Sequence, residues 1–384
     1  MSRSQEGVAA LVTEVHHRST LAAVRGLGRA GVDVVAVGPS GAAGRLSRYA
    51  TLSAWAPDPA ADPLAHRAAV AAALGGRSST VVYPGTEMSL DACLRPGDGS
   101  AAALRLPYAR PASLVTLRDK VEMARRATEA GLGAPETLYD GPLSGVGAAA
   151  LSLPYVVKQA RPAATDVATT VIREPGELHA LVATGPEDNR VVAQQLVEGP
   201  LMSVALVLDE DGRVRAEFHQ RGTRLWPAGA GSSSRAVGVP PQPAVTKAVA
   251  SFLQQAGYAG LAQLDYVATL QGPVVLDVNP RFYGSMPLAA ASGVNLPLAW
   301  HASVCGAPYS PPAAYREGVT FRWLEADLSD VRHGDRQALR ATPRPRVGAV
   351  WDCRDPLPSV RVAAAAVGRV LGARLRPASV AHEP

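Results

Sequence analysis

Lysine is nearly absent from this sequence of 384 residues. Only three of its 38 basic residues are lysine, at positions 120, 158 and 247, and all the others are arginine. A compact ammonium group and a planar guanidinium are not interchangeable as phosphate ligands. Each of the three lysines is therefore a candidate for a specific contact with an anion.

Cysteines, aromatic residues and long apolar runs are also scarce. Cys93, Cys305 and Cys353 are far apart and form no CxxC motif, which argues against a disulfide framework or a zinc site and favours a reducing compartment. No apolar run reaches about 18 residues, and the N-terminus has no signal-like region. We expect a cytoplasmic protein without a membrane segment, with a core built mainly from Ala, Val and Leu.

The positive charge is diffuse. The formal net charge is +5, but no basic run is interleaved with aromatic residues, so nucleic-acid binding is not expected. The excess suits a small anionic substrate, such as a nucleotide or a carboxylate.

The first hundred residues predict a parallel sheet. A strand at 8–13, a helix ending near Ala30 and a strand at 32–37 form a βαβ unit. The loop lacks GxGxxG, so a dinucleotide site has little support. Glu87 follows a strand at 80–83, at the end of the sheet where α/β proteins bind ligands; a solvated loop acid is the alternative.

Two of the rare lysines lie where phosphate could bind. Residues 116–119 have capping-box spacing and begin a helix that ends near Gly131, with Asp119 in its first turn. Lys120 then lies near a helix N-terminus, where a bound anion would offset its charge; an incidental surface lysine is the alternative. Lys158 ends a strand at 155–158 and opens a loop without glycine. A helix at 174–183 and a strand at 190–195 complete a small α+β unit.

A hairpin at 203–208 and 214–219 is followed by two arginines beside a Gly/Ser-rich segment at 226–234. Arg221 and Arg224 could hold carboxylate or phosphate oxygens bidentately, and solvated turn arginines are the alternative. Beyond residue 306, we expect a strand near 321–324 and a helix at 360–375 that packs on the core.

The most informative stretch is a second hairpin, with strands at 261–267 and 274–279. If the turn centres near Gln271, Asp265 faces Asp277 and Gln263 faces Asn279, all on one face of the sheet. Directly opposed carboxylates repel. A bound cation would offset the repulsion, and Mg²⁺ fits because it takes oxygen ligands and shares them with phosphates. An ordinary hairpin with a polar outer face is the alternative.

These motifs, in this order, resemble the ATP-grasp superfamily over about residues 8–306. The likeness is to the carboxylate–amine ligase branch, which is related to D-alanine–D-alanine ligase, biotin carboxylase and carbamoyl-phosphate synthetase. Asp265, together with Asp277 to Arg281, Gly284 and Ser285, looks like the family's metal-binding acid pair. The segments at 119–120 and 154–158 resemble its two nucleotide-binding lysine motifs. The segment at 194–199 is similar to the one whose backbone holds adenine. The family usually has glutamates where the two aspartates stand. It also has a glycine-rich loop where this chain has 161–166, and a ribose-binding glutamate just after Gly199, for which Glu198 is the candidate replacement.

The resemblance implies a mixed α/β and α+β ATP-grasp fold. Its expected parts are an N-terminal Rossmann-like parallel-sheet domain at 1–110, an ATP-grasp domain with a larger antiparallel sheet at 111–306, a small lid subdomain at about 136–200, and a C-terminal extension packing on the core at 307–384. ATP would lie between the lid and the larger domain. The implied reaction activates a carboxylate as an acyl phosphate, which an amine then attacks to give an amide.

The resemblance also assigns candidate residues and ligands. The expected metal ligands are Asp265, Asp277 and Asn279, for Mg²⁺ or, in its place, Mn²⁺. The expected ATP contacts are Lys120, Lys158, Gln194, Gln195, Val197, Glu198 and Leu276. The expected catalytic residues are Arg281, Lys158 and Arg224, and the expected substrate contacts are Glu87, Arg221, Arg224 and Tyr283. The partners would be a small-molecule carboxylate and amine, and the resemblance favours a homodimer. A thiol or hydroxyl acceptor, or a degenerate nucleotide-binding protein, is the alternative.

Overall fold

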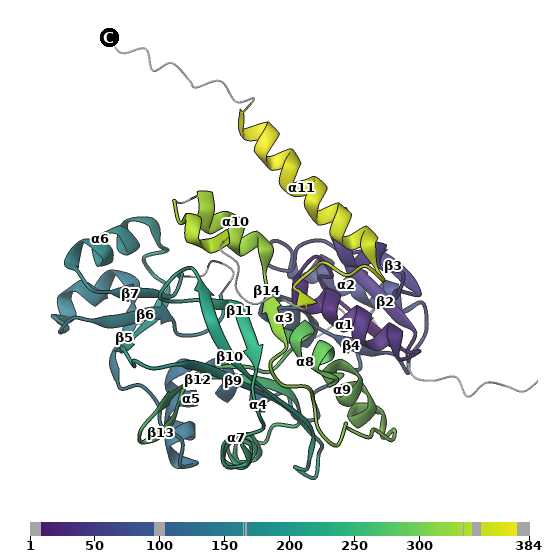
Figure 1. Ribbon diagram of the computed structural model, residues 1–384, viewed down its shortest axis with the longest axis horizontal. Coiled ribbons are helices and arrows are strands. Elements are labelled where there is room, and N and C mark those ends of the chain that lie inside the picture. The colour runs from purple at the N-terminus through teal and green to yellow at the C-terminus, as the bar shows by residue number, and fades with distance from the viewer. Residues whose placement is uncertain are drawn as a thin grey trace, which may run out of the picture.

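Three β-sheets follow one another along the chain in the computed structural model, and the largest lies between the other two in Figure 1. The structure describes residues 9–95, 104–163, 165, 167–332, 334–339 and 347–374. No helix among these residues has both the length and the apolar character needed to cross a membrane.

The first sheet is parallel, with strand order β3-β2-β1-β4. Its strands are β1 (Ala10–Val12), β2 (Val34–Gly38), β3 (Leu52–Trp55) and β4 (Val81–Tyr83). Its helices are α1 (Arg18–Arg29), α2 (Pro63–Leu74) and α3 (Glu87–Leu94), with a 3₁₀ turn, η1, at Ala43–Leu46. Ala10 and Val12 belong to one apolar cluster and Leu11 to another, so β1 is buried on both faces, as expected of a parallel sheet.

The second sheet is small and antiparallel, with order β5-β8-β6-β7. Two helices precede it, α4 (Ser113–Arg118) and α5 (Lys120–Glu129). Its elements are β5 (Thr137–Pro142), η2 (Leu143–Ala149), β6 (Tyr155–Gln159), β7 (Thr170–Ile172), α6 (Pro175–Thr184) and β8 (Arg190–Gln195). It has its own apolar cluster, which includes Leu143, Tyr155 and Ile172.

The third sheet has seven strands in the order β13-β12-β9-β10-β11-β14-β15. The strands are β9 (Leu201–Leu208), β10 (Val214–Trp226), β11 (Ser232–Gly238), β12 (Gly260–Thr269), β13 (Gly272–Asn279), β14 (Thr320–Arg322) and β15 (Val347–Gly348). The remaining elements are α7 (Pro243–Gln255), α8 (Met286–Ser292), α9 (Leu296–Cys305), α10 (Leu324–Arg332), η3 (Arg336–Leu339) and α11 (Pro356–Arg374).

The parallel sheet and the seven-stranded sheet share one continuous core. Helices α1, α8 and α9 lie between them in Figure 1, and Tyr83 of β4 packs edge-on against Trp300 of α9 with ring centroids 4.9 Å apart. The Asn295 amide, at the start of α9, also donates to the Gly26 carbonyl of α1 at 2.7 Å. These contacts fix the carboxyl ends of the parallel strands relative to the β12–β13 hairpin.

Two local expectations are corrected. Asp119 does not lie in the first turn of a helix that begins near Thr116, because the segment breaks into α4 and α5 and Asp119 is the N-cap of α5. Its carboxylate accepts from the amides of Val121 and Glu122 at 2.9 and 3.0 Å. The C-terminal helix α11 contacts η1 of the first domain and projects from the body in Figure 1, with Leu357 and Val360 of its first turns exposed.

Candidate active site

The β12–β13 hairpin pairs the two aspartates as the sequence predicts. Asp265 faces Asp277, and Gln263 faces Asn279. A bulge follows, because Tyr266 pairs with Val275 and leaves Leu276 as the extra residue of β13. The register at the turn therefore differs by one residue from the expected one, with Thr269 opposite Gly272, but the acid pair is unaffected.

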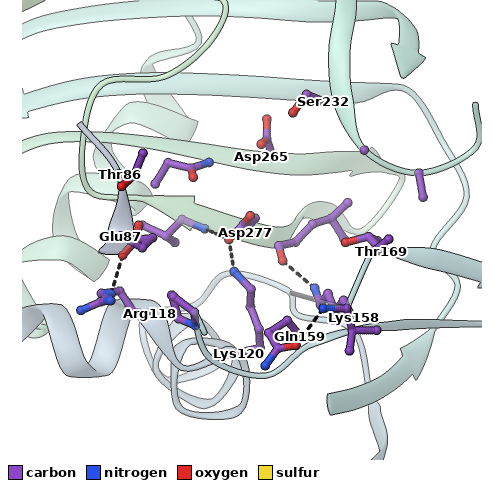
Figure 2. Close-up of a pocket in the computed structure, with 18 of the residues that line it drawn as sticks. Thr86, Glu87, Arg118, Lys120, Lys158, Gln159, Thr169, Ser232, Asp265 and Asp277 are labelled. Atoms are coloured by element: carbon purple, nitrogen blue, oxygen red, sulfur yellow. Dashed lines mark hydrogen bonds and ion pairs between the residues drawn. The ribbon is translucent and has the colours of Figure 1, made fainter. Parts of the chain in front are cut away.

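The bulge brings a backbone acceptor to one lysine. The ammonium of Lys158, at the end of β6, donates to the Leu276 carbonyl at 2.8 Å. Lys120, the first residue of α5, forms an ion pair with Asp277 (Figure 2). Backbone bonds hold both lysine-bearing segments close to the hairpin: the Lys120 amide donates to the Ala160 carbonyl, and Gly133 exchanges bonds with Pro273 and Val275.

The charges of this cluster are strongly coupled. Burial, together with the charge of Lys120, lowers the pKa of Lys158 to about 7, while Asp277 acts in the opposite direction. Desolvation works against the charge of Asp277, yet Lys120 and Lys158 hold its pKa below the ordinary value. Asp277 is therefore an anion with cationic partners already in place.

Asp265 is a half-buried carboxylate without such a partner. Ser203 and Gln263 both donate to its Oδ1 at 2.6 Å, and no cation forms an ion pair with it among the residues that the structure describes. Burial raises its pKa to about 6, and the two hydrogen bonds only partly oppose this. The Asn279 amide, on the same face, donates to Gln263 at 2.9 Å, which leaves the Asn279 oxygen available as a ligand.

Arg281 is held by the first domain. Its Nε donates to Glu87 at 2.8 Å, and Glu87 also pairs with Arg118 at 2.5 Å (Figure 2). Arg118 in turn makes two bonds to Asp91 of α3, at 2.6 and 2.8 Å. Glu87 was predicted as a substrate contact, and the structure gives it a part in orienting Arg281 as well.

The two lysines, the two aspartates, Asn279 and the group of Glu87, Arg118 and Arg281 line one cavity of about 1070 Å³. Its wall near the small sheet is largely apolar and includes Val156, Val171, Leu196, Val197 and Leu276. The Oε1 atom of Gln194, on the same wall, is buried and lacks a hydrogen-bond partner. An apolar wall with a few polar groups suits the base of a nucleotide. The two lysines and two carboxylates next to it suit the phosphates and a bound cation.

The structure brings most of the predicted site residues to this cavity. Those that line it are Glu87, Lys120, Lys158, Gln194, Gln195, Val197, Asp265, Leu276, Asp277, Asn279 and Arg281. Tyr283 lines a smaller neighbouring cavity.

Three predicted residues are not among the lining residues. Glu198 and Arg221 are exposed and line neither cavity. Arg224 is engaged elsewhere, since its Nη2 pairs with Asp330 at 2.7 Å and with Asp335 at 2.6 Å, which joins β10 to α10 and the loop that follows it. In this arrangement two carboxylates bind the Arg224 guanidinium, and Arg224 lines neither cavity.

Comparison with known protein families identifies the arrangement. Residues 187–326 match a family described as ATP-grasp in the biosynthetic pathway with Ter operon. The chain therefore has the ATP-grasp fold, and its sequence is similar to that family over these residues. A search of curated proteins finds no match for the sequence.

Solved ATP-grasp structures share the fold at low sequence identity. The biotin carboxylase–βγ-ATP complex of Campylobacter jejuni superposes with a TM-score of 0.61 at 14% identity, covering 82% of this chain and 75% of that one. An L-amino acid ligase from Bacillus licheniformis gives a TM-score of 0.56 at 16% identity, covering 78% and 75%. For pyruvate carboxylase of Rhizobium etli (T882A) the TM-score is 0.58 at 17% identity. That match covers 79% of this chain but only 29% of the carboxylase, so this chain spans less than a third of that protein.

Sequence reasoning missed several residues of this candidate site. Arg118 lies in the predicted capping box and Ser203 begins a predicted strand, but neither was singled out; Arg118 pairs with Glu87, which holds Arg281, and Ser203 donates to Asp265. Glu14, His16 and His17 line the cavity from the loop after β1, and Glu14 has a left-handed backbone with φ of 49°. That loop lies at the carboxyl end of a parallel strand, which is the one general signal that could have drawn attention to it.

Proposed function

We propose that this ATP-grasp protein is an ATP-dependent ligase that joins a small-molecule carboxylate to an amine. The observation that carries the proposal is the convergence of Asp265, Asp277 and Asn279 with Lys120 and Lys158 in one cavity. Phosphoryl transfer needs positioning and charge neutralisation more than covalent assistance, and this set of groups supplies both. The solved L-amino acid ligase of the same fold supports the choice of reaction.

The donor set fits a hard divalent cation such as Mg²⁺. Two carboxylates and an amide share one face of the hairpin, and the half-buried Asp265 has no cationic partner among the described residues. Asp265, Asp277 and Asn279 would hold the ion. A bound Mg²⁺ would neutralise phosphate charge and polarise the γ-phosphoryl group.

The lysines and Arg281 would act on the nucleotide and on the transferred group. Lys158, desolvated beside Leu276, would regain its charge when phosphate oxygens replace the apolar surroundings. Lys120, which pairs with Asp277 at the edge of the proposed metal site, would bind phosphate oxygens of the nucleotide. Arg281, held by Glu87, would stabilise charge on the phosphoryl group during transfer.

The proposed reaction has two steps. A carboxylate oxygen of the first substrate attacks the γ-phosphorus, and the bond to ADP breaks. The amine nitrogen of the second substrate then attacks the acyl carbon, phosphate leaves, and the amine proton is released. Acyl phosphates hydrolyse in water, so the small sheet that covers the apolar wall would act as a lid during turnover. A cytoplasmic location and a homodimer stay predictions from the sequence.

The test is the release of ADP and inorganic phosphate with ATP, Mg²⁺ and panels of carboxylic acids and amines. Active combinations should also form a hydroxamate when hydroxylamine replaces the amine. Asp277→Ala should reduce turnover at least 100-fold, because Lys120 loses its partner and the metal loses a ligand. The matched control is Asp211→Ala, which removes an exposed turn carboxylate that pairs only with Arg213 and should leave turnover unchanged.

Two outcomes would contradict the proposal. ADP without free phosphate would indicate transfer to a hydroxyl acceptor that keeps the phosphoryl group. No turnover with any pair, together with an ATP affinity that Asp277→Ala leaves unchanged, would indicate a protein without this catalytic site.

A further inference from the structure

A second cavity, of about 200 Å³, adjoins the candidate active site. It shares Ser232, Asp265, Asn279 and Arg281 with the larger cavity, so it opens beside the proposed metal ligands. Its other walls come from the start of α1, from Gln220 of β10 and from residues 283–285 after β13. A group bound there would lie next to the phosphoryl-transfer site and away from the apolar nucleotide wall.

Arg18, the first residue of α1, is a second cation of this cavity beside Arg281. Its Nε is buried without an acceptor, and among the described residues no carboxylate lies within ion-pair distance of its guanidinium. The group is held by the Trp323 ring, whose centroid is 3.5 Å from Arg18 Cζ. Burial lowers its pKa to about 10, and the charge of Glu325 opposes this, so Arg18 remains a cation near neutral pH.

The absence of a side chain at Gly284 leaves room for the Arg18 guanidinium. A Cβ atom at Gly284 would lie 2.4 Å from Arg18 Nε and 2.5 Å from its Nη2, so a larger residue there would displace the guanidinium. Gly284 follows the metal-binding strand by five residues, which ties the position of Arg18 to that of Asn279.

Two further buried polar atoms face the same space without partners. The Tyr283 hydroxyl belongs to a side chain that is 4% exposed, and Gln220 Oε1 to one that is 2% exposed. Gln220 uses its amide nitrogen to donate to Ser285 at 2.7 Å, so its oxygen is left as an acceptor. Residues 17–19 at the N-terminus of α1 line this cavity, and the N-cap, His17, makes no side-chain cap. Buried groups of this kind are costly unless a ligand satisfies them.

We propose, given the ligase function above, that this cavity binds the amine substrate as an α-amino acid, with its carboxylate on Arg18 and the Tyr283 hydroxyl. The unpartnered Gln220 oxygen suits an N–H of the amino group, which an α-amino acid presents one carbon away from the carboxylate. A guanidinium binds a planar carboxylate through paired donors, and the N-terminus of α1 favours the same charge.

The experiment measures binding separately from turnover. With Mg²⁺ and ADP present, the twenty common L-amino acids are screened by thermal shift, and the binders are titrated by calorimetry together with their amides. Wild-type protein should bind at least one amino acid, and bind its amide at least tenfold more weakly. Arg18→Met should weaken amino-acid binding at least tenfold and leave amide binding and ADP affinity unchanged. Arg18→Lys should retain an intermediate affinity.

Three further variants separate recognition from packing. Arg48→Met is the matched control, because Arg48 also lies over an aromatic ring, that of Tyr49, but lines neither cavity; it should change nothing. Tyr283→Phe keeps the shape and removes the hydroxyl, and should weaken amino-acid binding about threefold to tenfold. Gly284→Ala should reproduce the effect of Arg18→Met.

The results also separate this inference from the ligase proposal. Arg18-dependent binding of amino acids without any ATP turnover would contradict the ligase function and leave the carboxylate site standing. Turnover with acid and amine pairs whose KM is unaffected by Arg18→Met would contradict the carboxylate site and leave the ligase standing. The absence of any amino-acid binder, or an equal loss of acid and amide binding in Arg18→Met, would overturn the inference.

Discussion

Lys158 illustrates how a single residue can reduce stability in order to bind a ligand. Its ammonium is desolvated and lies near Lys120, so its charge is unfavourable until phosphate arrives. We expect Lys158→Met to weaken ATP binding about tenfold to 100-fold, while the melting temperature without nucleotide stays equal or rises. Calorimetry and thermal unfolding measure both. Lys247→Met changes the remaining, exposed lysine on α7 and should alter neither; a large loss of stability in Lys158→Met would contradict this account.

Some residues of the candidate site could be predicted from the sequence and others could not. Asp265 and Asp277 were predictable because strand periodicity and a short turn determine which side chains face each other. The two rare lysines stood out by composition. Arg18, Arg118 and Ser203 did not, because their positions depend on contacts between segments far apart in the chain. Arg224 was assigned to the substrate from its neighbours in sequence, whereas Asp330 and Asp335, more than a hundred residues later, determine its position.

At the scale of elements, the N-cap of α5 holds the start of a helix and the small sheet together. Asp119 is 3% exposed and caps α5, and its Oδ2 also accepts from Arg161 at 2.5 Å and from Arg190 at 3.0 Å. Burial opposes its charge, but the Glu122 amide and Arg161 hold the pKa below its usual value. Between the lowered pKa of Asp119 in the folded protein and its ordinary pKa in the unfolded chain, the unfolded chain binds more protons. The free energy of unfolding therefore rises with pH through that range.

We expect Asp119→Ala to lower the free energy of unfolding by about 1–2 kcal/mol near neutral pH, the usual value of a lost N-cap. Asp119→Asn keeps a capping oxygen and removes the charge, so its loss should be smaller. For wild type, the contribution of the charge should be complete above about pH 4, the ordinary aspartate pKa, and disappear as pH falls through the lowered folded value. Urea unfolding between pH 2 and 7 measures this; equal pH profiles for wild type and Asp119→Asn would contradict it.

The β-bulge at Leu276 shows why elements were predictable and their details were not. The alternation of side chains along a strand predicted the strand and the pairing of its two acids correctly. A bulge depends on contacts with the partner strand and with neighbouring segments, which this alternation does not reveal. Here the extra residue supplies the carbonyl that binds Lys158 and a side chain for the cavity wall. The split between α4 and α5 is similar, since Asp119 could serve either as a first-turn acid or as a cap, and only the contacts with Arg161 and Arg190 favour the cap.

At the scale of the whole molecule, a buried ion pair joins the C-terminal segment to the N-terminal domain. Arg25 of α1 donates from Nε to the Asp355 carboxylate at 2.9 Å and from Nη1 to the Val350 carbonyl at 2.7 Å. Ser47 and the amide of Arg48 also donate to Asp355, at 2.8 and 2.9 Å. Asp355 is 1% exposed and Arg25 is 6% exposed, so removing either partner would leave an uncompensated charge in the interior.

We therefore expect Asp355→Ala to lower the free energy of unfolding by about 3–5 kcal/mol, the usual cost of breaking a buried pair from one side. Its neighbour provides the control, because Asp352 pairs with Arg29 at the surface, where such pairs contribute about 0–1 kcal/mol. Urea unfolding of Asp355→Ala and Asp352→Ala, followed by circular dichroism, compares the two sites under the same conditions. Since Arg25 and Arg18 share α1, Asp355→Ala should also weaken amino-acid binding at temperatures where the protein is still folded, whereas Asp352→Ala should not. Equal losses of stability in the two variants would show that the C-terminal segment does not depend on this buried pair.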